Sequence, residues 1–500
     1  MDFISGEDRE QTILLPERIE DYVNDDSPVR VIDAYVNSLD LIDLGISNAE
    51  LKDTGRPPYD PRDLLKLYIY GYMNRIRSSR RLENETKRNL EILWLIGTLS
   101  PDYKTIARFR HDNSKALKNV FRNFVRMCVK LGLYGKELIA IDGSKFKAVN
   151  SRKRSFTEEQ IQKKIESITG KIDEYLGELD RNDEDENAAK SEKTAEEIKG
   201  IINSLKEKKE RYQGYADELK QTGEKQKSLT DSESRLMVGN GKTDVCYNIQ
   251  TVVDAKNKLV VDFEVSNQGN DYNFITPMAK SAMELLETET IAAVTDNGYA
   301  SIQDITSAME SGVQVHVAGT DFDICVPVKE DDAQAPSAVE GTVITGHHDG
   351  RCVYISERNI VVCPMGNVLY PSAYDKANGA VVFHNTQACK QCACKCTEKA
   401  SGIYSHHVRG IALEDFSKEY NDEGLAVKQV RIKPDKEIVS QRKGIVEHPF
   451  GTVKRTMDAG YCLTKGLKNV TGDFSLTFLA YNIKRVINIL GCGKLIESMA

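Results

Sequence analysis

Apolar residues recur at steps of three and four between residues 61 and 131, the spacing of helices with one buried face. Short apolar groups alternate with basic clusters in the first part of this segment. In the last part, from residue 117, a second helical pattern follows. Its apolar positions are Leu117, Phe121, Phe124, Cys128 and Leu131. Most basic side chains of this second pattern fall on the other faces of the helix. We therefore expect an all-helical domain over residues 1–133.

Residues 157 to 222 are rich in Glu, Lys and Gln and carry the helical spacing twice. The apolar positions are Ile161, Ile165, Ile168, Ile172, Tyr175 and Leu179, then Ile198, Ile202, Leu205, Tyr212 and Leu219. The polar segment RNDEDENAAKSE separates the two sets. This arrangement predicts two antiparallel helices that pack along their apolar faces and expose their polar faces to solvent. We assign residues 157–235 to this helical hairpin.

Short β-rich runs lie on both sides of the hairpin. One run, Leu138 to Ile141, ends on Asp142, and a later run, IAAVT, ends on Asp296. Between them, two runs flank a turn-like Asp254–Asn257 and predict a β-hairpin. Helical patterns at 273–286 and 302–311 and a strand pattern at 313–318 complete the series.

This order of elements predicts a mixed α/β sheet with helices on its faces. It is the order of an RNase H-like core that is interrupted twice. We expect core segments at 134–156, 236–320 and 439–500. The segment 321–438, with short strands and turns, forms a second insertion that contains most of the cysteines. The last core segment includes one helix around Glu447 to Arg455 and another from Phe474 to Leu490.

Charge is distributed unevenly along the chain. The net charge of −8 argues against a nucleic-acid partner if it is spread evenly. Between Arg56 and Lys130, however, 17 Lys and Arg face 7 Asp and Glu, a local excess of +10 that leaves −18 elsewhere. Such asymmetry favours a basic DNA-binding surface attached to an acidic body. Our candidates are Arg75, Arg77, Arg80 and Arg81; the alternative is an ordinary solvated basic face.

The N-terminus and the hydropathy pattern bear on localisation. Hydrophobic residues make up 40% of the chain, and no apolar run approaches the roughly 20 residues that span a bilayer. The N-terminus lacks the pattern of a signal peptide. We expect a soluble, cytoplasmic protein with no membrane partner.

Asp142 and Asp296 are the first candidate catalytic residues. Each follows an apolar strand and is followed within two residues by glycine. In open α/β sheets, sites gather at the carboxyl ends of strands, so the two carboxylates are expected to converge there. Oxygen ligands of this kind suit Mg²⁺, and a pair of ions assists phosphodiester chemistry. Taken alone, either aspartate is more simply a turn residue at a strand end.

Glu447 is the candidate for a third carboxylate. Proline is tolerated in the first turn of a helix, so Pro449 suggests that Glu447 lies at a helix start. Lys454, seven residues on, would share its face and reach a phosphate. Arg442, Lys443 and Arg455 make the surroundings basic. The simpler alternative is that Glu447 is a helix N-terminal charge.

At these residues the chain resembles the DDE transposases of bacterial insertion sequences, closest to the group numbered eleven eighty-two. The resemblance covers nearly the whole chain. Its blocks are GRPPYDPRDLLKLYIYGY, PDYKTIARFR, AIDGSKFKA, DSESRLM, YNIQTVVD, VTDNGYAS, VEHPFGTVKR and FSLTFLAYNIKRVINILG. One departure is Ser440, which stands where related transposases often have tyrosine, while Lys443 stands at their arginine position.

The resemblance implies that Asp142, Asp296 and Glu447 are the catalytic acids and bind two Mg²⁺ or Mn²⁺ ions. It implies double-stranded DNA as partner, both as terminal inverted repeats of the element and as target. It also implies a homodimer that joins two ends, in the nucleoid of a bacterium. The alternatives are an RNase H-like nuclease without strand transfer, and an inactive or domesticated transposase that acts as a DNA-binding regulator.

The cysteines suggest a second metal. Cys389, Cys392 and Cys396 form a C-x2-C-x3-C pattern, and Cys363 is a candidate fourth ligand for structural Zn²⁺. Cys394 and His384 are substitutes for the fourth position. Zinc would stabilise an insertion that is too poor in apolar residues to build a core. The alternative is a set of free thiols in a reducing compartment.

Overall fold

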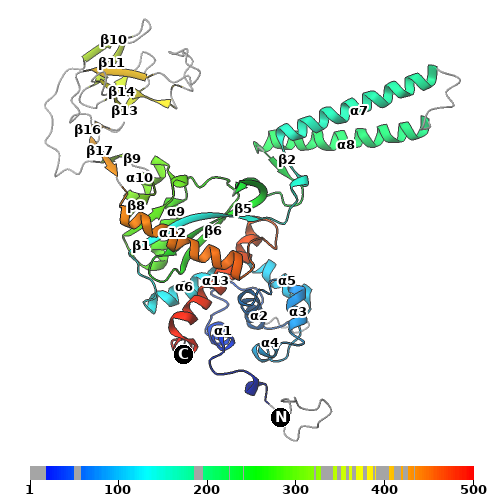
Figure 1. Cartoon of the computed structure of the whole chain (residues 1–500), viewed down its shortest axis with the longest axis vertical. Coiled ribbons are helices and arrows are strands. Elements are labelled where there is room, and N and C mark those ends of the chain that lie inside the picture. The colour runs from blue at the N-terminus through cyan, green and yellow to red at the C-terminus, as the bar shows by residue number, and fades with distance from the viewer. Residues whose placement is uncertain are drawn as a thin grey trace, which may run out of the picture.

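A computed structural model shows helices at the N-terminal end packed beside a mixed sheet, from which two insertions extend (Figure 1). The mixed α/β class with a helical N-terminal region is therefore confirmed. The structure describes residues 18–49, 58–184, 195–224, 226–239, 241–319, 322–327, 342–345, 351–355, 360–362, 368–375, 380–386, 389, 405–409, 418–420, 426–432 and 434–499. Among these residues, no helix has both the length and the apolar character needed to cross a membrane.

The N-terminal region consists of helices, four of which begin at a side-chain cap. Asp60 accepts a hydrogen bond from the backbone of Arg62 at the start of α2, and Asp102 caps α5 in the same way. The helices are α1 (Pro28–Asn37), α2 (Pro61–Met73), α3 (Ser79–Glu85), α4 (Leu90–Leu95), α5 (Tyr103–Asp112) and α6 (Ser114–Lys130), after a 3-10 turn at Ile19–Tyr22. The predicted apolar face of α6 is buried from Leu117 to Cys128, which confirms the helical spacing.

The central sheet has β1 in its middle. Its strands are β1 (Leu138–Lys147), β4 (Arg235–Gly239), β5 (Lys242–Asp254), β6 (Val260–Ser266), β7 (Ile291–Thr295) and β8 (Val313–Val317). β5 runs antiparallel to β1, and its other edge pairs with β4 along its first half and with β6 along its second. β7 and β8 continue the sheet in parallel on the other side of β1. The carboxyl ends of β6, β1, β7 and β8 therefore lie at one edge.

β1 is longer than the sequence pattern predicts. We expected a strand that ends at Ile141, but pairing with β5 continues from Ile139 to Lys147. Pairing with β7 stops at Ala140. Asp142 is thus inside β1, just beyond the end of its parallel ladder. The long hydrogen-bonded edge of β5 keeps the polar continuation of β1 extended, a tertiary effect that local propensity does not report.

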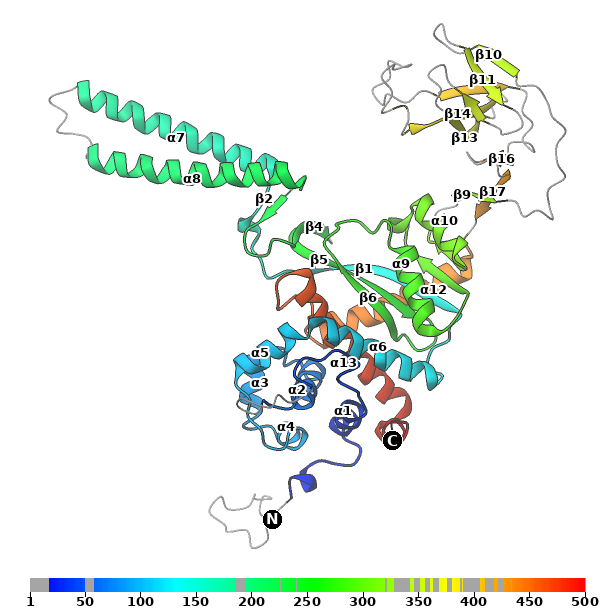
Figure 2. The ribbon, with the colours of Figure 1, turned by 180° about the vertical axis from the view of Figure 1, so that it is seen from behind.

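Helices cover both faces of the sheet. They are α9 (Ile275–Leu286), α10 (Ile302–Glu310), α12 (Lys436–Gly451) and α13 (Leu467–Leu490). The last helix, α14 (Cys492–Glu497), packs against α1 and α13. Figures 1 and 2, which show opposite sides of the molecule, place α12 on one face and α9 on the other. The even-numbered side chains of β1 face α12, because Phe146 packs against Phe450 at a ring distance of 6.2 Å.

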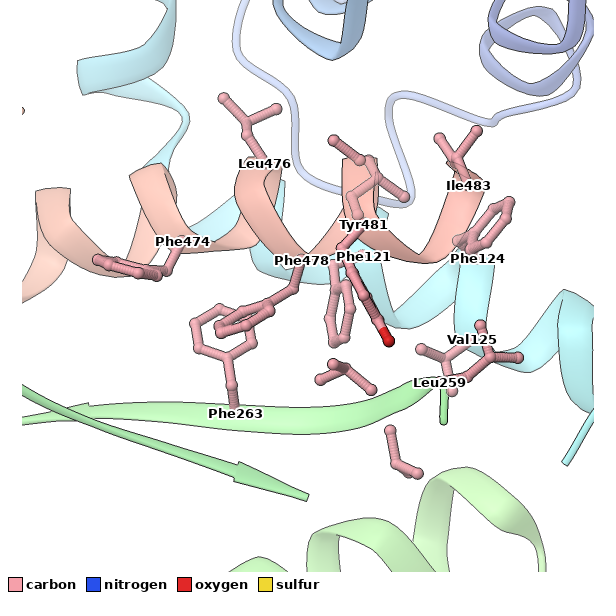
Figure 3. Packing of buried hydrophobic residues seen from close by; sticks show 14 of the residues in the cluster. Phe121, Phe124, Val125, Leu259, Phe263, Phe474, Leu476, Phe478, Tyr481 and Ile483 are labelled. Atoms are coloured by element: carbon pink, nitrogen blue, oxygen red, sulfur yellow. The ribbon is translucent and has the colours of Figure 1, made fainter. Parts of the chain in front are cut away.

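α13 lies between the N-terminal helices and the sheet. Figure 3 shows Phe474 and Phe478 of α13 next to Phe121 of α6 and Phe263 of β6. The ring centres of Phe478 and Phe263 are 5.0 Å apart. One buried cluster runs from Val23 to Leu495 and includes both the N-terminal helices and the sheet. The hydrophobic core therefore continues across the domain boundary that we predicted at residue 133.

The first insertion is a pair of long helices, α7 (Glu158–Glu184) and α8 (Ala195–Thr222), that extends from the body (Figures 1 and 2). Its apolar seam forms two clusters of its own, and one of them contains Ile168, Ile172, Ile198 and Ile202. The chain enters and leaves through two paired strands, β2 (Ser155–Thr157) and β3 (Gln226–Ser228). The two predicted helices are thus confirmed.

The second insertion consists of strands. A six-stranded antiparallel sheet contains β10 (Thr342–Thr345), β11 (Arg351–Ile355), β12 (Ile360–Val362), β13 (Val368–Asp375), β14 (Ala380–His384) and β15 (Ser405–Arg409). A three-stranded sheet contains β16 (Lys418–Tyr420), β17 (Ala426–Ile432) and β9 (Phe322–Pro327). Because β9 pairs with β17, this insertion also enters and leaves through neighbouring strands.

Candidate active site

Asp142 and Asp296 come together at the edge where β1 and β7 end. The parallel register pairs Ala140 with Val294, and two further residues along each chain bring Asp142 beside Asp296. Burial raises the pKa of the Asp142 carboxyl to about 7. This pKa is the balance of burial, the opposing Arg442 guanidinium, and the carboxylates of Asp296 and Asp271, which add to the increase. The structure therefore gathers negative charge around Asp142.

Glycines allow the chain to pack closely around this pair. A Cβ atom on Gly143 would lie 2.4 Å from Nε2 of Gln250 and 2.7 Å from Oδ1 of Asp271. The backbone nitrogen of Gly298 donates a 2.8 Å hydrogen bond to Oδ1 of Asp296, which caps the 3-10 turn Asn297–Tyr299. Asp296 therefore also caps a turn at a strand end, which is the simpler alternative that we considered, and it does so while it lies at the same edge of the sheet as Asp142.

Arg442 reaches this edge from α12. Its Nη1 atom lies 3.5 Å from Oδ1 of Asp142, and both side chains are half-buried. The sequence predicted Arg442 as part of a basic DNA-binding surface. In the structure its guanidinium compensates the charge of Asp142.

Glu447 lies on α12, but not in its first turn. α12 begins at Lys436, where Asp435 caps it, and Pro449 is near its C-terminal end. Our argument from proline was therefore wrong about the helix start. A proline removes only the hydrogen bond of its own nitrogen, and here the helix changes within one turn to the π-helical segment Thr452–Thr456. The side chain of Glu447 is exposed and forms no hydrogen bond or ion pair with another described residue, and the described part of the chain does not bring it together with Asp142 and Asp296 as a set of three metal ligands.

Lys454 lies in the π-helical segment and points to β1. Its Nζ atom donates to Oγ of Ser144 at 2.6 Å and to the carbonyl of Lys145 at 3.2 Å. It also lies 4.4 Å from the ring centre of Phe146. Burial lowers the pKa of this ammonium, while Asp142 is among the groups that oppose the shift. Lys454 is therefore near the carboxylate pair, on the face of β1 that α12 covers.

Asp271, Gln250 and Tyr299 also belong to this edge, and our sequence analysis did not select them. Asp271 accepts from Gln250 Nε2 at 2.7 Å, and the hydroxyl of Tyr299 donates to the Gln250 carbonyl. Burial raises the pKa of Tyr299 well above its ordinary value, and the three aspartates add to this shift. A signal was present, because Asp271 follows β6, whose carboxyl end lies at the same edge.

The predicted DNA-binding arginines separate into two groups. Arg75, Arg80 and Arg81 are exposed, as are Lys443 and Arg455 near the other end of the chain. Arg77 is only 4% exposed. Its guanidinium forms a 3.1 Å ion pair with the buried Asp473 of α13 and donates to two backbone carbonyls. Arg77 therefore joins the N-terminal helices to α13, and our assignment of it to a DNA surface was wrong.

The proposed zinc ligands fall largely outside the described residues. Cys363, Cys392 and Cys396 are not described, and neither is Cys394. Cys389 is a half-buried free thiol, and His384 belongs to β14. Across the described ranges, no three His, Cys, Asp or Glu side chains are arranged so that they could hold a metal ion. The zinc site remains a prediction from the sequence, without structural support.

Comparisons with known proteins match two segments of the chain. Residues 17–112 match a family model described as a transposase domain (DUF772), and residues 362–487 match one described as a transposase DDE domain. The second segment contains Glu447 and Lys454 but neither aspartate. Among curated proteins, no similar sequence is found.

One solved structure is similar over much of the chain. It is a cryo-EM structure of the piggyBac transposase synaptic complex with hairpin DNA, 10% identical, and the match covers 95% of this chain and 80% of that chain. Its TM-score of 0.29 is too low to bear on the fold. The family matches to two separate segments therefore support a DDE transposase.

Proposed function

We propose that this protein is the DNA transposase of a bacterial insertion sequence and that its central sheet is an RNase H-like core. The sheet order β6-β5-β1-β7-β8, with β5 antiparallel to its neighbours and β7 and β8 parallel to β1, supports this core. The observation that carries the proposal is the convergence of Asp142 and Asp296 at the carboxyl ends of β1 and β7. Segments 157–235 and 321–438 are, on this proposal, insertions into the core.

Mg²⁺ or Mn²⁺ fits the chemistry of this edge. Carboxylate oxygens are the ligands these ions prefer, and the pKa of Asp142 is raised mainly by burial and also by the neighbouring carboxylates of Asp296 and Asp271. Asp142 and Asp296 would hold the ions, two in number. Glu447 would complete the set only after a movement of α12, because this carboxylate is exposed and forms no three-ligand group with the two aspartates among the described residues. When bound, the ions supply Lewis-acid stabilisation of the attacking and leaving oxygens.

The chain's own cations would position the DNA. Arg442 and Lys454 lie beside the carboxylates, where they would hold a phosphate next to the scissile bond. Arg75, Arg80 and Arg81 offer exposed charge on the N-terminal helices, and Lys443 and Arg455 do so near α12. On this proposal, the N-terminal helices bind the terminal inverted repeats, and two copies of the chain bring the two ends together.

Three substitutions test the catalytic assignment. Asp142→Asn, Asp296→Asn and Glu447→Gln should each abolish cleavage of DNA that carries the element's ends. Binding to these ends should change little, because the carboxylates act at the scissile phosphate. Glu437→Gln, an exposed carboxylate in the first turn of α12, is the matched control and should cleave normally. Wild-type cleavage by any of the three variants would contradict the assignment.

The products of the unaltered protein distinguish the alternatives. A transposase should join the freed 3′-hydroxyl to a target duplex, which is measured as a strand-transfer product on a gel. Cleavage without joining would indicate an RNase H-like nuclease. Sequence-specific binding without cleavage would indicate a regulator. Terminal inverted repeats in the DNA that flanks the gene would support a mobile element.

A further inference from the structure

Asp271 approaches the carboxylate pair from the face of the sheet opposite to α12. It lies in the loop between β6 and α9, and its carboxylate is close to both glycines at the site. Its Oδ1 atom lies 2.7 Å from the position of a Cβ on Gly143. Its Oδ2 atom lies 3.6 Å from that of a Cβ on Gly298, which in turn would be 2.9 Å from Oδ1 of Asp296. Asp271 is therefore a neighbour of the chain segments that carry both aspartates.

Neutral donors hold one oxygen of Asp271 in place. Oδ1 accepts 2.7 Å hydrogen bonds from Nδ2 of Asn248 and from Nε2 of Gln250, both fully buried on β5. Tyr299 donates to the carbonyl of Gln250, which sets the orientation of that amide. These groups fix the carboxylate without neutralising it.

The second oxygen of Asp271 has only a distant partner. The Lys145 ammonium lies 4.0 Å from Oδ2, at the limit of an ion pair. The carbonyl oxygen of Asn248 has no hydrogen-bond partner, although this side chain is completely buried. A buried oxygen without a donor is costly. The unpartnered oxygen of Asn248 and the weakly paired Oδ2 of the half-buried Asp271 therefore leave acceptor capacity around Asp271.

We propose that Asp271 is a positioning carboxylate that strengthens the binding of a hydrated divalent cation at Asp142 and Asp296. The inference rests on the proposed function and extends it to a third aspartate. Oxygen groups around the direct ligands orient them and accept hydrogen bonds from the water molecules of the ion, and their loss typically weakens metal binding about 10- to 100-fold. Asp271, fixed by Asn248 and Gln250, has the chemistry and the position for this role.

The test is a titration of the full chain with Mn²⁺ in the absence of DNA, in which free Mn²⁺ is followed by electron paramagnetic resonance. Asp271→Asn keeps a side-chain oxygen that can accept from Asn248 and Gln250 and removes only the charge. We expect the Kd for Mn²⁺ to rise about tenfold or more. Glu284→Gln on α9 removes an exposed carboxylate from the following helix and should leave the Kd unchanged.

Thermal unfolding separates this role from a structural one. Without metal, Asp271→Asn should unfold at the same temperature as the unaltered chain or at a higher one, because a negative charge near Asp296 is gone. The increase in Tm caused by Mn²⁺ should shrink. An unchanged Kd, a variant that is less stable or unfolded without metal, or no Mn²⁺ binding by the unaltered chain would each overturn the inference. Failure of the proposed function is distinct: Asp142→Asn and Asp296→Asn would then cleave DNA normally.

Discussion

At the scale of single residues, a fully buried carboxylate, Asp473, explains why one predicted DNA contact is wrong. Asp473 of α13 is fully buried and pairs with Arg77 at 3.1 Å and Arg110 at 3.8 Å. Tyr72 donates to the same carboxylate, and so does the backbone of Leu463. A carboxylate at this depth requires cations, so two arginines of the basic segment are used inside the protein.

Removing this carboxylate should strongly destabilise the protein. Asp473→Ala leaves Arg77 and Arg110 as buried cations without their partner, which typically costs about 3–5 kcal/mol. Urea denaturation measures the loss in the free energy of unfolding. The exposed Asp217→Ala on α8 is the control and should change little. A loss as small for Asp473→Ala as for this control would contradict the structural role of the network.

The ion pairs of Asp473 with Arg77 and Arg110 also predict that the stability of the protein depends on pH. The guanidinium groups of Arg77 and Arg110 hold the pKa of Asp473 below its ordinary value of 3.8, although burial opposes them. A carboxyl whose pKa is lower in the folded state stabilises the protein above about pH 4 and loses this contribution as the pH falls through the folded-state value.

The free energy of unfolding, measured by urea denaturation between pH 5 and 3, tests this dependence. It should therefore fall less steeply with acid in Asp473→Asn than in the unaltered chain. Equal slopes in the two proteins would show that Asp473 does not contribute to acid sensitivity.

At the scale of elements, both insertions are attached through paired strands. Ser155 and Ser228 form a buried 2.9 Å hydrogen bond between β2 and β3, and the hairpin beyond them has its own apolar clusters. β9 and β17 form the corresponding pair for the second insertion. Because each insertion begins and ends at adjacent strands, the chain can pass directly from one strand to the other, and the central sheet can form without the insertion.

Excision of the helical hairpin should therefore leave the body folded. Thr157 pairs with Gln226, so Asn-Gly in place of residues 158–225 would give a two-residue turn between β2 and β3. We expect urea denaturation to show an unchanged or slightly higher stability of the body, because a shorter connection loses less entropy on folding. A longer excision, residues 155–228, removes the Ser155–Ser228 contact and should destabilise the body. Loss of folding in the shorter variant would contradict this picture.

At the scale of the whole molecule, α13 links the parts that the sequence analysis separated. Phe478 is fully buried and lies between Phe474 of the same helix and Phe263 of β6. Basic residues of α6 complete the junction from the other side. Lys118 and Arg122 form ion pairs of 2.6 and 2.7 Å with the buried Asp262 of β6. The basic segment therefore contributes to the core as well as to the surface.

One substitution in α13 should consequently weaken both sides of this junction. Phe478→Ala should cost about 3–5 kcal/mol through the lost contacts and the cavity. Hydrogen exchange should show reduced protection in α2 and α6 and, to the same extent, in β5 and β6. The control is Ile489→Ala in the same helix, where the side chain is 38% exposed. Reduced protection on one side only would indicate two separate cores.

The sequence by itself determined the features that depend on residues close together in the chain, namely the helices, the strands and the points where strands end. Apolar spacing located α6, the hairpin helices and the strand patterns before Asp142 and Asp296, because helix and strand periods are properties of the local chain. Strand ends then brought two aspartates to one edge, since parallel strands finish together. These signals sufficed to identify the class of fold and the carboxylate pair.

Only the tertiary structure decided which long-range partner each side chain meets. β1 continues past Asp142 because β5 pairs with it, Arg77 is buried because Asp473 lies opposite, and Asp271 reaches the pair from another loop. Glu447 lies late in α12, whose start at Lys436 is far from the proline that we used to locate it. Each of these depends on contacts between residues distant in the chain, and a periodic pattern does not contain them.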